Sequence, residues 1–254
     1  MELREFFEEH PEVAIAFSGG CDSAYLLYAA SKFAKRVKGY FVKTAFQPDF
    51  ELEDAKRFAS EYSIDLKVIQ YDVLKDEDVC ANPGNRCYFC KNKIMGVIKE
   101  NAKNDGFDVL LEGTNASDDE TDRPGMKVLA ELNILSPLRM CGITKGEVRE
   151  RSKEAGLFTW DKPAYACLAT RVPAGTYITG EILSGTEKAE SFLSSLGFSD
   201  YRVRYRDGNA LIQLVGEQHE LYEKEREKIE AELGKYYSTI SLDPTPRWKS
   251  VHEF

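Results

Sequence analysis

Short apolar runs alternate with helix-like segments along the first half of the chain. The apolar runs predict four strands, at residues 13–17, 40–42, 66–71 and 107–111. Residues 51–61 instead repeat their apolar side chains with the spacing of one helix face. Strands that alternate with helices indicate a parallel sheet wrapped by helices. The ligand site of such a sheet lies at the carboxyl ends of its strands.

The second half of the chain has a different pattern. Residues 126–134 begin apolar and run into Ser136-Pro137-Leu138, which predicts one more strand. Thr144, with Glu147 three residues later, predicts a capping box at the start of a helix that Gly156 ends. Residues 162–175 show little periodicity and contain two prolines, and the remainder of the chain has the pattern of a compact α+β unit. We therefore expect an α/β fold with a domain at residues 1–163, a linker at 164–179 and a smaller α+β domain at 180–254.

Composition narrows the class of protein. The 254 residues are 43% hydrophobic and contain no apolar run of membrane length, which is typical of a globular protein without membrane partners. The charged N-terminus, Met1-Glu2-Leu3-Arg4, lacks a signal-peptide core, so we expect a cytoplasmic location. The net charge is −9, from 34 basic and 43 acidic residues. This sign disfavours a nucleic-acid partner held by electrostatics.

The loop after the first predicted strand carries the strongest chemical signal. It reads Ser18-Gly19-Gly20-Cys21-Asp22-Ser23 and leads into a helix-forming segment. Glycines let an anion approach the backbone, and the free N–H groups at a helix start attract it, so we predict a phosphate site. Asp22-Ser23 replaces the lysine of a Walker loop, which disfavours ordinary γ-phosphate transfer. A plain glycine-rich turn is the alternative. The form of this loop resembles the PP-loop of the ATP pyrophosphatase superfamily, and that resemblance implies ATP at this loop with Mg²⁺ on Asp22.

A second loop follows the strand predicted at residues 107–111. It contains Gly113, Thr114 and Asn115, directly after Glu112. Small and amide side chains at a strand end suit recognition of a ribose or a base, although a plain turn is the alternative interpretation. We name Gly113, Thr114 and Asn115 as candidate nucleotide-binding residues.

Six cysteines in a chain of this kind favour metal ligands or reactive thiols over disulfides. Cys87 and Cys90 are three apart at a predicted helix start, where free N–H groups and Lys91 favour their thiolates. A redox pair, half of a zinc site and two buried small residues are the alternatives. Cys167 lies in the aperiodic loop near Arg171, which favours its thiolate too, and Cys80 reads as an ordinary buried thiol.

Several stretches together resemble one family, the LarE-type sulfur transferases of the PP-loop ATP pyrophosphatase superfamily. The stretches are AFSGGCDSAYLL (16–27), NRCYFCK (85–91), EGTNASD (112–118), RPGMKVLAELNILSPL (123–138), TKGEVR (144–149), KPAYACLATRVPAGTYIT (162–179) and RVR (202–204). The loop at 18–23 is common to the superfamily, whereas KPAYACLATR followed by RVR is much more specific. The resemblance implies the parallel sheet of that superfamily.

The resemblance also implies a reaction. ATP activates a carboxylate of a pyridinium biscarboxylate mononucleotide as its acyl-adenylate, and sulfur then replaces AMP to give a thiocarboxylate. Cys167 stands where single-cysteine members give up their own sulfur. Cys87 and Cys90 together with Cys167 resemble the subclass in which three cysteines hold a 4Fe-4S cluster that receives inorganic sulfide. We favour the cluster version over the sacrificial one.

Further roles follow from the resemblance and from position. Arg202 and Arg204 alternate on a predicted strand, so both point to one face and can clamp the substrate phosphate. Glu190 stands where the family has a divalent-metal ligand, whereas Gln213 departs from the family's glutamate. The candidate catalytic residues are Cys167, Arg171 and Lys91, and the family implies a homo-oligomer. A tRNA thiolase, an iron-sulfur carrier and an amide-forming synthetase are the other hypotheses.

Overall fold

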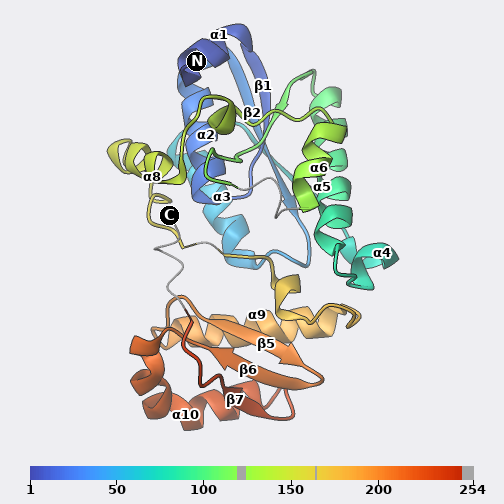
Figure 1. Ribbon diagram of the computed structural model, residues 1–254, viewed down its shortest axis with the longest axis vertical. Helices are drawn as coiled ribbons and strands as arrows, with labels where there is room; N and C mark the ends of the chain where they lie inside the picture. The colour runs from blue at the N-terminus through green and yellow to red at the C-terminus, as the bar shows by residue number, and fades with distance from the viewer. Residues whose placement is uncertain (119–123, 164, 248–254) are drawn as a thin grey trace. The chain divides into compact units, whose positions relative to one another are not determined.

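The computed structural model describes residues 1–118, 124–163 and 165–247 (Figure 1). They form two compact units. The first comprises Met1–Asp72 and Asn85–Lys162, and the second comprises Val73–Gly84 and the chain from Pro163 onward. The pattern of apolar residues in the sequence did not predict that residues 73–84 belong to the second unit. The predicted boundaries at 163 and 179 stay a prediction, and residues 248–254 of the predicted second domain lie outside the described residues.

The first unit is built on the parallel sheet that the sequence predicts. Its strand order is β3-β2-β1-β4, and each pair of neighbours is parallel. The strands are β1 (Glu12–Ala16), β2 (Arg36–Lys43), β3 (Leu66–Gln70) and β4 (Leu110–Leu111). Because β1 pairs with β4 at Ala14↔Leu110, the loops that follow these two strands leave the same edge of the sheet.

Helices cover both faces of this sheet (Figure 1). Val13 and Ile15 of β1 pack in a core with α2 (Cys21–Phe33), α3 (Asp49–Glu61) and α8 (Lys145–Glu154). Ala14 and Ala16 point the other way, into a core with α5 (Arg86–Asn104) and α6 (Pro124–Glu131). This alternation along one strand shows why β1 reads as a continuous apolar run. The remaining helices of the unit are α1 (Leu3–Glu9) and α7 (Pro137–Met140).

The strand predicted at residues 126–134 is wrong. Most of that segment is α6, and a single parallel bridge between Leu111 and Leu135 lies beyond its end. Val128 and Leu129 are both buried, so the apolar run packs as helix turns. A short apolar run fits a strand and a buried helix equally well, and here packing decides. The capping box of Thr144 and Glu147 at α8 is confirmed.

The second unit contains a three-stranded sheet of order β5-β6-β7. Its strands are β5 (Arg202–Arg206), β6 (Asn209–Gln213) and β7 (Ile240–Leu242). Asp207 and Gly208 join β5 to β6 with φ of 47° and 83°, the two-residue turn that an Asp-Gly pair favours. Val203 and Ile212 bury one sheet face against α9 (Gly180–Ser195) and α10 (His219–Leu233). The short α4 (Glu77–Cys80) also belongs to this unit.

Three single turns of 3-10 helix complete the described secondary structure, η1 (Val73–Lys75), η2 (Leu168–Arg171) and η3 (Gly216–Gln218). No helix in the described ranges is both long and apolar enough to cross a membrane.

Candidate functional site

The loop between β1 and α2 folds back on the first turn of the helix. Gly19 has a φ of +78°, a backbone conformation that glycine adopts without strain. The Ser23 hydroxyl accepts from the Ser18 N–H at 3.2 Å and lies 3.0 Å from the Ser18 hydroxyl. Gly20 is the N-cap of α2, so no capping side chain covers the helix start there. The first N–H groups of α2 therefore have no side-chain cap, and together with the positive end of the helix they suit a phosphate group.

The loop after β4 packs directly against this helix start. A Cβ on Gly113 would lie 2.8 Å from the backbone nitrogen of Ser23, so only glycine fits. Asn115 donates from Nδ2 to Asp22 Oδ1 at 3.3 Å. Thr114 donates from its backbone N–H and from its hydroxyl to the carboxylate of Glu112. The structure therefore brings the two predicted nucleotide-binding loops together.

Lys91 belongs to the same neighbourhood. Its Nζ, on the second turn of α5, lies 3.9 Å from Glu112 Oε2. Glu112 is buried and also accepts a 2.5 Å hydrogen bond from Ser136. The candidate catalytic lysine is thus placed beside the loop that carries Thr114 and Asn115.

Two lysines at this loop were missed as site residues by the sequence reasoning. Lys145, the first residue of α8, places Nζ 2.5 Å from Asp22 Oδ2. Lys162 places Nζ 2.7 Å from Asp54 and 3.2 Å from the carbonyl oxygen of Gly19. Both stand in the TKGEVR and KPAYACLATR stretches, where the only sequence signal was the motif itself. Packing of α8 on α2 brings Lys145 to this loop, and Lys162 reaches it from the segment that follows α8.

Cys21, inside the phosphate loop, is a buried thiol. It is 4% exposed, and its sulfur lies 3.9 Å from the Ser152 hydroxyl. Burial raises the pKa of the Cys21 thiol, so it stays protonated near neutral pH. This thiol packs α2 against α8.

Cys87 and Cys90 lie at the start of α5, as the CxxC spacing predicts. Cys87 is exposed and Cys90 is half-buried. Arg86 donates from Nη2 to the Cys87 sulfur at 3.6 Å, so a guanidinium contacts this sulfur at the helix start. Cys167 belongs to the other unit, and no cluster of three metal-binding side chains occurs among the residues described. The three-cysteine ligand set stays a prediction.

Arg171 and Glu190 form a buried ion pair inside the second unit. The Arg171 side chain is 0% exposed and donates from Nε and Nη2 to the two oxygens of Glu190 at 2.8 and 3.0 Å. Tyr165 and the backbone N–H of Val203 also donate to this carboxylate. Burial, followed by the charge of Glu190, raises the pKa of Tyr165, so its hydroxyl remains a donor. Glu190 is the counter-ion of Arg171 in this arrangement, and its role as a metal ligand stays a prediction.

Arg171 also shapes the turn that presents Cys167. Cys167 is half-buried and precedes η2. Arg171 donates from Nη1 to the carbonyl oxygens of Ala166 at 2.7 Å and Cys167 at 3.4 Å. Thr170 donates to the Cys167 carbonyl from its N–H and its hydroxyl. The contacts of Arg171 are those of a positioning residue.

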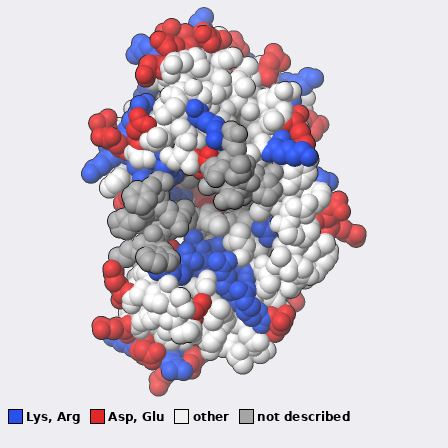
Figure 2. All heavy atoms as spheres, in the orientation of Figure 1, with Lys and Arg blue, Asp and Glu red and all other residues white. Residues whose placement is uncertain are grey.

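Positive charge exceeds negative charge around Arg202 and Arg204. Burial first, and then the charges of Arg171 and Arg247, lower the pKa of Arg202 to about 10. The same causes lower the pKa of Arg204. Figure 2 shows Lys and Arg side chains gathered over the sheet of the second unit. Such a set of guanidiniums favours an anion. Arg247, which the sequence reasoning missed, is 3.4 Å from Asp200.

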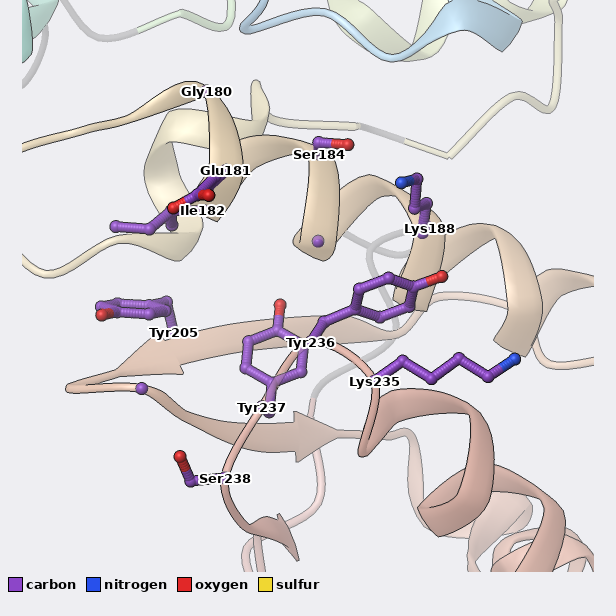
Figure 3. Close-up of a pocket in the computed structure, with 12 residues that line it drawn as sticks. Gly180, Glu181, Ile182, Ser184, Lys188, Tyr205, Lys235, Tyr236, Tyr237 and Ser238 are labelled. Carbon is purple, nitrogen blue, oxygen red and sulfur yellow. The ribbon is translucent and has the colours of Figure 1, made fainter.

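A separate groove of about 610 Å³ opens in the second unit (Figure 3). It is lined by the start of α9, by Tyr205 and by the segment after α10. The Tyr237 hydroxyl is 3.1 Å from that of Thr186, and the side chain of Lys235 pairs with Glu232. None of the candidate catalytic, nucleotide-binding or metal-binding residues lines this groove. It is therefore distinct from the predicted site.

Two relatives align with most of the chain. An uncharacterized protein of Synechocystis sp. is 38% identical over 221 residues, which cover 85% of this chain and 81% of the relative. An uncharacterized protein of Methanocaldococcus jannaschii is 30% identical over 227 residues, 89% of this chain and 86% of the relative. The chain belongs to the family of these two proteins. No model of a known protein family matches it.

Two further relatives of this chain have names that describe an activity. The pyridinium-3,5-bisthiocarboxylic acid mononucleotide synthase of Lactiplantibacillus plantarum is 29% identical over 236 residues, 91% of this chain and 85% of the relative. A tRNA-specific 2-thiouridylase of Pseudothermotoga lettingae is 25% identical over 187 residues, 59% of this chain and 54% of the relative. With the loop at residues 18–23, they place the family in the PP-loop superfamily of ATP-using enzymes.

The contact between the two loops predicts the effect of one added methyl group. Gly113→Ala forces a Cβ to within 2.8 Å of the Ser23 backbone, so we expect a loss of about 1–3 kcal/mol in the free energy of unfolding and weaker ATP binding. Gly96→Ala in α5 is the matched control, because a Cβ there meets nothing within 4 Å among the described residues. It should stabilise the helix by up to about 1 kcal/mol. Urea unfolding and calorimetric ATP binding measure both, and equal behaviour of the two variants would contradict the contact.

The buried ion pair predicts non-additive stability effects. Arg171→Met leaves Glu190 buried without its cation and should cost about 3–5 kcal/mol of unfolding free energy. The double variant Arg171→Met/Glu190→Met should recover much of this loss, because no uncompensated charge remains. Arg226→Met on the exposed face of α10 is the control and should leave stability unchanged. Urea unfolding decides, and strictly additive single losses would show that the pair is not coupled.

Proposed function

We propose that this protein is an ATP-dependent sulfur transferase that converts a carboxylate of pyridinium-3,5-biscarboxylic acid mononucleotide into a thiocarboxylate. The observation that carries the proposal is the alignment with the pyridinium-3,5-bisthiocarboxylic acid mononucleotide synthase over 91% of the chain. That alignment accompanies a phosphate-type loop in the first unit and a turn built around Cys167 in the second. The resemblance extends the proposal to a cytoplasmic homo-oligomer.

The first step is adenylylation of the substrate. A carboxylate oxygen attacks the α-phosphorus of ATP, the bond to the β-phosphate oxygen breaks, and pyrophosphate leaves. The backbone N–H groups around Gly19 and Gly20 bind the leaving pyrophosphate, since they lie at the start of α2. Lys145 and Lys162 stand beside this loop and neutralise the charge that develops on the phosphates.

Asp22 fits a role as Mg²⁺ ligand. Its carboxylate lies at the phosphate loop, oriented by Asn115 on one oxygen and Lys145 on the other. Carboxylate oxygens are the ligands that Mg²⁺ prefers, and the ion usually binds through one or two of them plus the substrate phosphates. Bound Mg²⁺ supplies charge neutralisation for the pyrophosphate. Asn115 then holds Asp22 in place from the neighbouring loop.

The second step introduces sulfur. A sulfur nucleophile attacks the carbonyl carbon of the acyl-adenylate, and AMP leaves with the electron pair of the broken C–O bond. Cys87 and Cys90, with Cys167, are the soft ligands that would hold a 4Fe-4S cluster, and the cluster would supply an open iron site for inorganic sulfide. The alternative is sacrificial: Cys167 itself attacks, and elimination at its β-carbon releases the thiocarboxylate and leaves dehydroalanine.

The remaining candidate residues hold the substrate. Arg202 and Arg204 bind its phosphate, which the excess of buried positive charge around them favours. Arg171 orients the turn that presents Cys167. Lys91 pairs with Glu112, which precedes the loop at residues 113–115 that we propose contacts the ribose or the base. A tRNA substrate is the second candidate, because 2-thiouridylases are among the relatives. The net charge of −9 and the 59% coverage favour the small molecule.

Turnover should depend on the small-molecule substrate. With ATP and Mg²⁺, release of AMP and pyrophosphate is expected only when pyridinium-3,5-biscarboxylic acid mononucleotide is added. Asp22→Asn should lower kcat/KM by about 10²-fold or more, because the Mg²⁺ ligand is lost. Asp65→Asn, at a surface pair with Lys38, is the control and should match wild type. Turnover that requires tRNA instead would replace this proposal with the second candidate.

Iron analysis separates the two routes for sulfur. Protein reconstituted without oxygen should contain about four iron and four acid-labile sulfide per chain, with the visible spectrum of a 4Fe-4S cluster. Cys87→Ala, Cys90→Ala and Cys167→Ala should each abolish the cluster, and Cys80→Ala, at a buried thiol, should retain it. A retained cluster in any of the first three variants would refute this ligand set. If no cluster forms, intact mass after turnover should show the chain lighter by one hydrogen sulfide.

A further inference from the structure

Arg204 is held by a neutral side chain. From β5 it donates from Nε to Gln213 Oε1 at 2.9 Å and from Nη1 to the backbone oxygen of Thr170 at 2.6 Å. Gln213, on β6, donates in turn from Nε2 to Asp243 Oδ2 at 2.8 Å. These three side chains form a chain of hydrogen bonds across the sheet face opposite the core residues Val203 and Ile212.

The two neighbours of Gln213 select one orientation of its amide. A guanidinium has only donors, so it requires the amide oxygen, whereas an ionised carboxylate has only acceptors and requires the amide nitrogen. Asp243 is held ionised: hydrogen bonds from Gln213, and then from the backbone of Thr245, lower the pKa of its carboxyl. With Asp243 ionised, Gln213 presents an oxygen to Arg204.

The neutral partner matters for charge. Arg171 makes a bidentate pair with Glu190, so a carboxylate neutralises its guanidinium directly. Arg204 instead meets an amide, and the carboxylate of Asp243 lies one side chain further away. The charges of Arg171 and Arg247 act on Arg204 as well. An amide thus fixes the direction of Arg204 and leaves its charge to an incoming anion.

We propose that Gln213 and Asp243 are positioning residues that orient the guanidinium of Arg204 without neutralising it, so that Arg204 binds the phosphate of the mononucleotide substrate. The proposal rests on the proposed function, because that function supplies the phosphate. Gln213 thereby determines how strongly the second unit holds an anion.

Binding of a simple pyridinium mononucleotide tests the charge part. Gln213→Glu keeps an acceptor for Arg204 but adds a carboxylate that neutralises it, so the Kd of nicotinate mononucleotide, measured by calorimetry, should rise about tenfold or more. Gln218→Glu makes the same change at an exposed amide of η3 that bonds Ser199, and it should bind like wild type. The Kd of ATP should stay unchanged in both variants. Wild-type affinity in Gln213→Glu overturns the proposal.

A spectroscopic readout tests the positioning separately. The ¹⁵N–¹H signal of the Arg204 Nε–H, assigned by its loss in Arg204→Lys, should shift in Asp243→Asn, because the amide of Gln213 is then free to turn. It should not shift in Gln218→Glu. An unmoved signal in Asp243→Asn overturns the positioning role. If nicotinate mononucleotide binds Arg204→Met as tightly as wild type, Arg204 is not the phosphate site and the proposal is overturned. A failure of the proposed function is recognised separately, because the wild-type protein would then show no release of AMP that depends on the pyridinium substrate.

Discussion

The first unit depends on a contact between two backbones. β1 and β4 are paired at Ala14↔Leu110, so the loops that follow them meet, and Gly113 lies so close to Ser23 that no Cβ fits between them. This is a constraint of volume, and it has an electrostatic consequence. It brings the amide of Asn115 within hydrogen-bonding distance of Asp22 and fixes that carboxylate at the phosphate loop. A chemical site is thereby defined by strand pairing and by the absence of one methyl group.

The lysines near this loop and the arginines of the second unit differ in the charges that surround them. Lys145 pairs with Asp22 and Lys162 pairs with Asp54. Neither lysine is therefore left as an unpaired, partly buried charge while no anion is bound. Arg202 is buried and Arg204 is half-buried, and burial together with the charges of Arg171 and Arg247 lowers the pKa of both guanidiniums, although Arg202 also lies 4.0 Å from Asp200. A chain of net charge −9 can therefore hold anions through local excess of positive charge.

The sequence allowed the parallel sheet and the loop at its edge to be predicted, because periodicity and glycine placement are local signals. The strand predicted at residues 126–134 was wrong because a short apolar run has neither the periodicity of a strand nor that of a helix. Val128 and Leu129 can be buried equally well on a helix. Ion pairs between residues distant in the sequence could not be predicted. Glu190 and Arg171 are 19 residues apart, and nothing local indicates that one neutralises the other. The grouping of residues 73–84 with the second unit is equally a property of the packed chain.

Arg171 and Arg204 both contact the turn that presents Cys167, but they differ in their side-chain partners. The guanidinium of Arg171 is neutralised by Glu190, and its Nη1 donates to the carbonyl oxygens of Ala166 and Cys167. Arg171 therefore stabilises the conformation of this turn. Arg204 reaches the same turn through the carbonyl of Thr170, but its side-chain partner is the neutral Gln213. Because both residues hold one turn, an anion bound by Arg204 is fixed relative to the Cys167 backbone. In the proposed function, the phosphate bound by Arg204 would thereby position the substrate carboxylate relative to the Cys167 turn.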